Sequence, residues 1–149
     1  MSLRIAGTDD ELEHGTTYIH RAARLWSIAG DERRARRIRE WPKDFAAAPE
    51  PDPDDEYPPD KVYSVGGLEH LLGLLEGLGD ALRATVTDPH LRIDAETAAR
   101  IRAISEVLVD SWEEQGKTIY TLANRVAEVH DLEAFLQRAI ELDRNVEVR

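Results

Sequence analysis

Leucines recur at intervals of three and four residues from Leu68 to Leu82, which places them on one face of an α-helix. Comparable rows run from Leu12 to Trp26, from Ile101 to Val129 and from Leu132 to Ile140. Because a helix with one apolar face must bury it against another element, these rows predict an all-α fold. We expect an antiparallel bundle of four to five helices.

Capping and helix-breaking residues set the limits of the first helices. Thr8 followed by Glu11 has the spacing of a capping box, which predicts the start of the first helix, and Gly30 predicts its end. Asp31 then caps a short second helix, which should stop at Trp41 because Pro42 disfavours the α conformation in the residue before it. The leucine-rich third helix should run on to about residue 86. Gly73 and Gly77 within it are expected to let another helix approach closely.

The apolar row between residues 101 and 129 continues in phase through Gly116. Glycine with no Asn, Asp or Pro beside it is a weak turn signal, which favours one long helix at about residues 94–130 over a hairpin at Gly116. Asp131 predicts a fresh helix start, because the apolar phase changes there. Residues 144–149 alternate valine with charged residues; of the two interpretations, a frayed tail and a short edge strand, the tail is preferred.

Charge is unevenly distributed along the chain. Arginine dominates residues 33–39, whereas residues 48–65 form a loop rich in proline and acids. Opposite charge makes the arginine-rich helix the expected partner of this loop, with Tyr57 and Tyr63 as its anchors. The same arginines could otherwise bind a polyanion.

Composition narrows the class of protein. The 149 residues suit a single domain, residues 1–149, without any cysteine for disulfides or thiolate chemistry. We find no signal-peptide pattern and no apolar run of about 20 residues, so we expect a cytoplasmic protein that does not enter membranes. A net charge of -11 makes nucleic acid an unexpected partner.

Two acidic pairs could hold a metal ion. Asp110 and Glu113, and Glu128 and Asp131, are each spaced three residues apart, which places both members of a pair on one helix face. The arrangement resembles the MazG-like nucleoside triphosphate pyrophosphohydrolases, which bind Mg²⁺ through an ExxE pair and an ExxD pair on adjacent helices. The resemblance implies a Mg²⁺-dependent hydrolase with these four residues as metal ligands. It covers about a quarter of the chain, and Asp110 departs from the family's Glu.

Helix geometry constrains this interpretation. In a continuous helix Glu113 and Glu128 would lie about 22 Å apart at 1.5 Å per residue, too far to share an ion within one subunit. A hairpin at Gly116 would bring them together. Otherwise the four acids form a solvated helix face.

Arg125 and His130 form a second catalytic candidate. The string Arg125-Val-Ala-Glu-Val-His130 resembles the motif of HEPN-type ribonucleases, which are dimeric helical bundles. The resemblance implies that Arg125 stabilises negative charge on the phosphate while His130 transfers a proton. Val126 stands where that family has a polar residue.

Neither motif is strong enough to predict catalysis. The preferred hypothesis is a non-enzymatic helical interaction or regulatory module, acting through its surface on a protein partner and forming a homodimer. No cofactor is expected, apart from Mg²⁺ under the pyrophosphohydrolase alternative.

Overall fold

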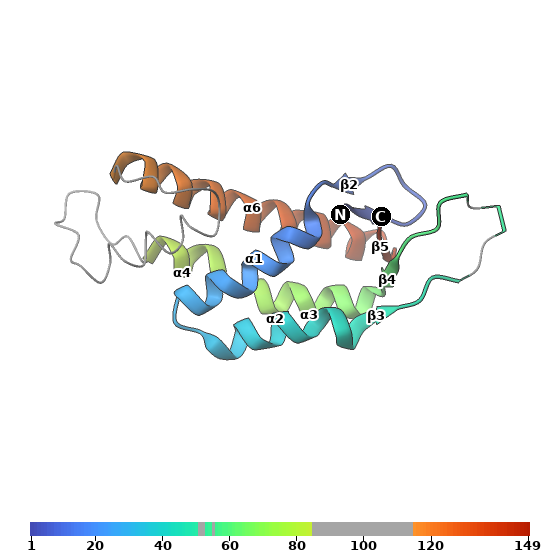
Figure 1. Ribbon diagram of the computed structural model, residues 1–149, viewed down its shortest axis with the longest axis horizontal. Coiled ribbons are helices and arrows are strands. Elements are labelled where there is room, and N and C mark those ends of the chain that lie inside the picture. Colours follow the sequence, from blue (N-terminus) through green and yellow to red (C-terminus); the bar gives the residue numbers. More distant parts are fainter. Residues whose placement is uncertain (51–52, 55, 85–114) are drawn as a thin grey trace.

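The computed structural model describes residues 1–50, 53–54, 56–84 and 115–149, and combines a layer of helices with a small sheet at one end (Figure 1). The helices are α1 (Gly15–Ile28), α2 (Glu32–Phe45), α3 (Val65–Leu75), α4 (Leu78–Ala84) and α6 (Gln115–Glu141). The strands are β1 (Leu3–Ile5), β2 (Glu11–Leu12), β3 (Ala46–Ala47), β4 (Lys61–Tyr63) and β5 (Val146–Val148). The expectation of an all-α bundle is therefore wrong: the described residues form a mixed α/β structure.

The sheet joins the two ends of the chain. Its strand order is β2-β1-β5-β4-β3, and every neighbouring pair is antiparallel. Ser2 and Arg149 exchange two backbone hydrogen bonds of 3.0 Å. Residues 144–149 are thus not a tail, because β5 is the central strand. Val146 and Val148 are buried on one face while Glu147 lies between them on the other, as strand geometry requires.

The N-terminal segment also departs from the predicted helix. The Thr8 hydroxyl donates to the carbonyl of Ile5 at 2.8 Å and accepts from the backbone N–H of Asp10 at 3.1 Å. Both bonds close the turn between β1 and β2, where Glu11 belongs to the second strand. Serine and threonine close such turns as well as they cap helices. The helix itself begins only at Gly15, which packs against Leu3.

Two predicted helix signals are confirmed. α1 ends at Ile28, and Gly30 follows with a φ of +94°. The carboxylate of Asp31 then caps α2 by accepting from the backbone N–H of Arg34 at 3.0 Å. The predicted end at Trp41 is wrong, since α2 includes Pro42 and continues to Phe45. Buried Trp41 donates its indole N–H to the carbonyl of Gly67 at 2.8 Å, which holds this part of α2 against α3.

The leucine-rich stretch is two helices and not one. α3 ends at Leu75, and Gly77 adopts a φ of +83° before α4 begins. Glycine adopts this left-handed conformation at little cost, so Gly77 allows the chain to change direction between α3 and α4. Among the described residues the space around Gly73 is open, which does not fit the expected close approach of another helix.

α6 is continuous through Asp131, so the predicted helix start at that residue is wrong. Gly116 lies within α6 as its second residue. Most of the predicted helix at residues 94–130 lies outside the described part of the chain. The choice between one long helix and a hairpin at Gly116 therefore stays a prediction.

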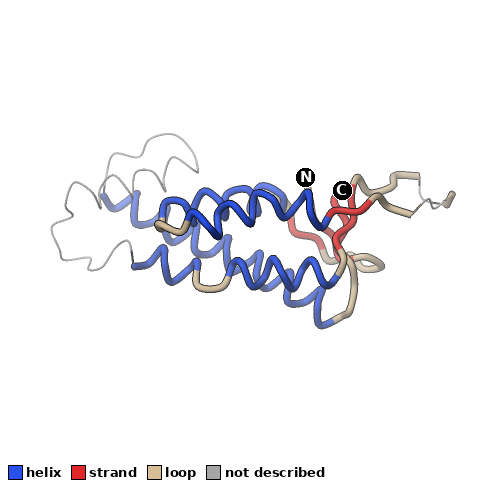
Figure 2. Tube along the Cα trace, turned by 90° about the horizontal axis from the view of Figure 1, so that it is seen from below, coloured by secondary structure: helices blue, strands red, loops and turns tan. Residues whose placement is uncertain are grey.

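The core lies between the helices, where α1, α2, α3 and α6 pack together, and it extends to the sheet at their end (Figure 2). Leu71 and Leu75 are fully buried as predicted, whereas Ile104 and Leu108 lie outside the described residues. Trp26 is buried as well, and its indole N–H donates to the carbonyl of Leu74 at 2.9 Å. Most apolar residues of the predicted helix faces are therefore buried where they are described, but Leu12 belongs to β2, the leucine row is divided between α3 and α4, and the predicted class of fold is wrong.

The described parts of the acidic loop extend from β3 and β4 away from the helices (Figure 1). Tyr63 is buried as expected, whereas Tyr57 is 76% exposed, and its backbone carbonyl accepts a hydrogen bond of 2.7 Å from Arg149. Arg39 contacts Ser27 and Glu32 within the helical layer. No helix among the described residues is long and apolar enough to cross a membrane.

Candidate functional site

Two of the four predicted metal ligands, Glu128 and Asp131, lie within the described residues. Asp110 and Glu113 lie outside the described residues. Glu128 lies on α6, where one carboxylate oxygen accepts from Arg21 at 2.7 Å and the other accepts from Arg125. Asp131 is exposed. Both oxygens of Glu128 are thus engaged by guanidinium groups.

Arg125 is the one buried charged side chain among the described residues, with 2% of its surface exposed. Its Nη1 donates to Glu128, whereas its Nε is buried without a hydrogen-bond partner in the described part of the chain. Burial lowers the pKa of the Arg125 guanidinium, and the charge of Glu128 opposes that shift. Arg125 therefore belongs to a buried ion cluster that links α6 to α1 through Arg21.

His130 does not share the environment of Arg125. Five residues along an α-helix correspond to a rotation of about 140°, so the two side chains leave α6 in different directions. His130 is exposed, and its Nδ1 lies 4.0 Å from a carboxylate oxygen of Glu133. Within one subunit the structure does not bring Arg125 and His130 together.

Metal-binding residues are likewise dispersed. In the described ranges, no three His, Asp or Glu side chains gather closely enough to hold a metal ion. No described cluster therefore adds to the metal-dependent interpretation.

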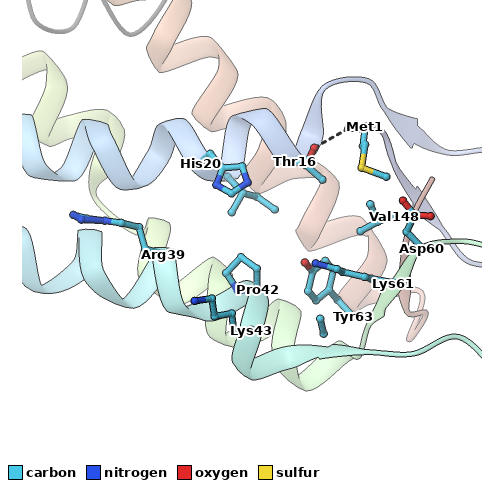
Figure 3. A pocket seen from close by; sticks show the side chains of 12 residues that line it. Met1, Thr16, His20, Arg39, Pro42, Lys43, Asp60, Lys61, Tyr63 and Val148 are labelled. Atoms are coloured by element: carbon cyan, nitrogen blue, oxygen red, sulfur yellow. Dashed lines mark hydrogen bonds between the residues drawn. The ribbon is translucent and has the colours of Figure 1, made fainter.

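A groove near the sheet, lined by described residues, is a candidate site. It has a volume of about 620 Å³ and opens between α1, α2 and the strands β4 and β5 (Figure 3). Its lining is mainly apolar, and His20 on α1 faces Pro42 on α2 across it (Figure 3). The lining residues are Met1, Thr16, Ile19, His20, Arg39, Pro42, Lys43, Ala46, Asp60, Lys61, Tyr63 and Val148.

Most of the charged side chains of this groove are cationic. Lys43 and Lys61 are exposed at its edge, and neither is ion-paired with a described residue. Arg39 is also at the edge, but its guanidinium forms an ion pair with the carboxylate of Glu32 at 3.3 Å. Asp60 is the acid in the lining. A local excess of positive charge in a chain of net charge -11 indicates a site for an anionic group.

Tyr63 gives the groove a rigid wall. Its ring packs against that of Trp41 with centroids 4.3 Å apart, and burial raises the pKa of its phenol. The phenol therefore stays a neutral hydroxyl near pH 7, although it lies beside cations. It can offer a hydrogen bond to a ligand without adding charge.

A second hollow of about 410 Å³ lies between α3 and α6 and has the opposite character. Its lining includes Glu69, Glu76 and Glu133. Burial raises the pKa of the Glu133 carboxyl, as do the charges of Asp80 and Glu76, while His130 lowers it. The two hollows thus differ in charge, one cationic and one anionic.

The groove was not predicted from the sequence. Its cations come from α2 and β4, its apolar lining comes from α1, α2 and the sheet, and no periodic pattern connects these segments. The basic stretch that contains Arg39 and Lys43 was the one signal available, and the β4 strand that carries Lys61 was not expected.

Comparison of the chain with protein-family models, with curated proteins and with solved structures finds no match. The protein is therefore described by its structure alone. Its described residues form a layer of helices with an antiparallel sheet at one end and a cationic groove where the two meet.

Proposed function

We propose that the protein is a non-enzymatic regulatory module and that the groove between α1, α2 and the sheet is its ligand site. The observation that carries this proposal is a mainly apolar cavity edged by two cations, Lys43 and Lys61, that form no ion pair with a described residue. Small-molecule sites typically occupy about 300–1,000 Å³ and combine apolar walls with a few polar groups, and this groove fits that description.

The position of the groove suits regulation. Ile19, Pro42 and Val148 line it from α1, α2 and β5, so that a bound ligand contacts three elements at once. Any ligand that binds only the folded state stabilises that state, and the stabilisation grows with the logarithm of the ligand concentration once that concentration exceeds Kd. Occupation of the groove would therefore strengthen the junction between the helices and the sheet.

The catalytic alternatives receive less support. Glu128 already accepts two guanidinium groups, so a metal ion there would first have to displace Arg21 and Arg125. Arg125 is buried while His130 is exposed on another side of α6. The cytoplasmic location, the protein partner and the homodimer stay predictions.

A thermal-shift panel tests the proposal. Small organic anions, cations and neutral compounds of similar size would be compared at equal concentration. We expect anions with apolar groups to raise the melting temperature, and Lys43→Glu/Lys61→Glu to abolish the effect. The matched control is Arg33→Glu/Arg37→Glu, which makes the same charge change at exposed positions of α2 outside the groove.

Two outcomes would overturn this function. One is a set of melting temperatures that no anion raises, or that anions raise equally in both double variants. The other is Mg²⁺-dependent release of pyrophosphate from nucleotides that Glu128→Ala abolishes while circular dichroism shows that the variant is still folded, which would establish the hydrolase instead.

A further inference from the structure

We propose that the ligand of the groove is a free organic monocarboxylate with an extended apolar body. This inference rests on the proposed function and adds the chemical class of the ligand. It follows from the balance of charge in the groove, the size of the groove and its lining.

Charge in the groove favours an anionic headgroup. Arg39 is paired with Glu32 and contributes little net charge. Lys43 and Lys61 carry two positive charges, and Asp60 carries one negative charge. These three side chains together are positive, which favours an anion over a neutral or cationic ligand, and Asp60 disfavours a second negative charge on that ligand.

Volume and lining indicate an apolar body. A bare carboxylate would occupy a small part of about 620 Å³ and would leave most of the groove to water. Ile19, Ala46 and Val148 offer aliphatic surface, and Pro42 and Tyr63 offer rigid ring surface. Contact with these walls requires a ligand with several methylene groups or a ring next to its carboxylate.

The ammonium groups suit a carboxylate headgroup. Each lysine can donate up to three hydrogen bonds, and the Tyr63 hydroxyl can donate one more. Charge-assisted bonds of this kind are about twice as strong as neutral ones. We therefore assign the carboxylate to the lysine edge and the apolar body to the space between His20 and Pro42 (Figure 3).

Calorimetric titration with hexanoate, heptanoate and octanoate tests the apolar part. We expect each added methylene to tighten binding about 4-fold, which corresponds to about 0.8 kcal/mol per buried CH₂. Acetate should not bind measurably. Equal affinity along the series would overturn the assignment of an apolar body.

Headgroup variants test the charge. Octan-1-ol and octylamine should bind at least about 10-fold more weakly than octanoate, and octyl phosphate should not bind more tightly. Lys43→Gln/Lys61→Gln should weaken octanoate at least about 10-fold, whereas Arg33→Gln/Arg37→Gln should leave it unchanged. Circular dichroism of each variant verifies that it is folded.

Vesicles separate a free ligand from a membrane surface. Binding to anionic phospholipid vesicles without binding to soluble octanoate would overturn the proposal in favour of a lipid surface. Failure of octanoate would overturn the ligand class alone, provided that other anions still raise the melting temperature through Lys43 and Lys61. Failure of every anion would instead refute the function on which this inference rests.

Discussion

Arg21 on α1 donates a hydrogen bond of 2.7 Å to Glu128 on α6, which joins residues 107 positions apart in the sequence. Arg125 donates to the second oxygen of the same carboxylate. Glu128 thus compensates the charge of a guanidinium that has 2% of its surface exposed. This cluster holds α1 against α6, and it gives Glu128 a structural role that does not depend on a metal.

Glu128→Gln should lower the free energy of unfolding by about 3 kcal/mol, because it leaves Arg125 buried without its counter-charge. Urea denaturation measures this change. Glu141→Gln is the matched control, since Glu141 is exposed near the end of the same helix and its replacement should cost less than about 0.5 kcal/mol. A Glu128→Gln variant as stable as the original protein would contradict the structural role of Glu128.

Val146→Ala should destabilise the protein by about 1.5–2 kcal/mol, because two buried carbon groups are lost at about 0.8 kcal/mol each and a small cavity remains. Val146 is fully buried in the central strand. Leu142→Ala serves as the control, because Leu142 is 47% exposed between α6 and β5 and its truncation should have little effect. Equal stability of both variants would mean that residues 144–149 are a tail after all.

Gly15→Ala should cost about 1–3 kcal/mol, because the new Cβ would lie 2.6 Å from the Cγ of Leu3. This overlap would push α1 away from β1. Gly73→Ala should act in the opposite direction and stabilise α3 by about 0.5–1 kcal/mol, since a Cβ there would contact no described atom apart from its chain neighbours and the backbone of its own helix. The two melting temperatures should therefore move to opposite sides of the original value. A fall in both would show that another surface covers Gly73.

Glu133→Gln should make the protein more stable at neutral pH and flatten part of its pH dependence. A raised pKa in the folded state means that folding penalises the ionised carboxylate of Glu133. The penalty is absent below the usual glutamate pKa of about 4.3, where both states are protonated, and is complete above the raised pKa. Stability should therefore fall across that window in the original protein and fall less in the variant. Denaturation at a series of pH values measures the difference, and parallel curves would contradict it.

The helical part of this fold could be predicted because its signals are local. Leu71 and Leu75 lie about one helix turn apart, and Asp31 caps a helix by accepting from an N–H three residues away. The sheet could not be predicted in the same way. A three-residue strand such as Leu3–Ile5 shows one alternation only, and its partner Val146–Val148 lies at the other end of the chain.

Local signals also failed where two structures compete for the same residues. Thr8 and Glu11 match a helix cap, but the Thr8 hydroxyl closes a turn between strands. Pro42 predicts a helix end, but the contact of Trp41 with Gly67 keeps α2 intact. In both cases tertiary contacts outweigh a preference worth a few kcal/mol at most.

The groove was not predicted from the sequence, and none of the predicted site residues lines it. Arg125 was selected for a catalytic motif, yet its burial with Glu128 is a feature of packing. The groove depends instead on residues such as Lys43 and Lys61, which line the same groove only after α2 and β4 have folded. No spacing rule along the chain could have connected these two lysines.

The most direct test of the ligand site is a ¹H–¹⁵N correlation spectrum of the protein titrated with octanoate and naphthalene-2-sulfonate. We predict that the amide signals which shift most belong to Ile19, Ala46, Lys61 and Val148, from four elements around the groove. Shifts that cluster instead around Glu69, Glu76 and Gln137 between α3 and α6, or that spread evenly over the surface, would contradict the assignment.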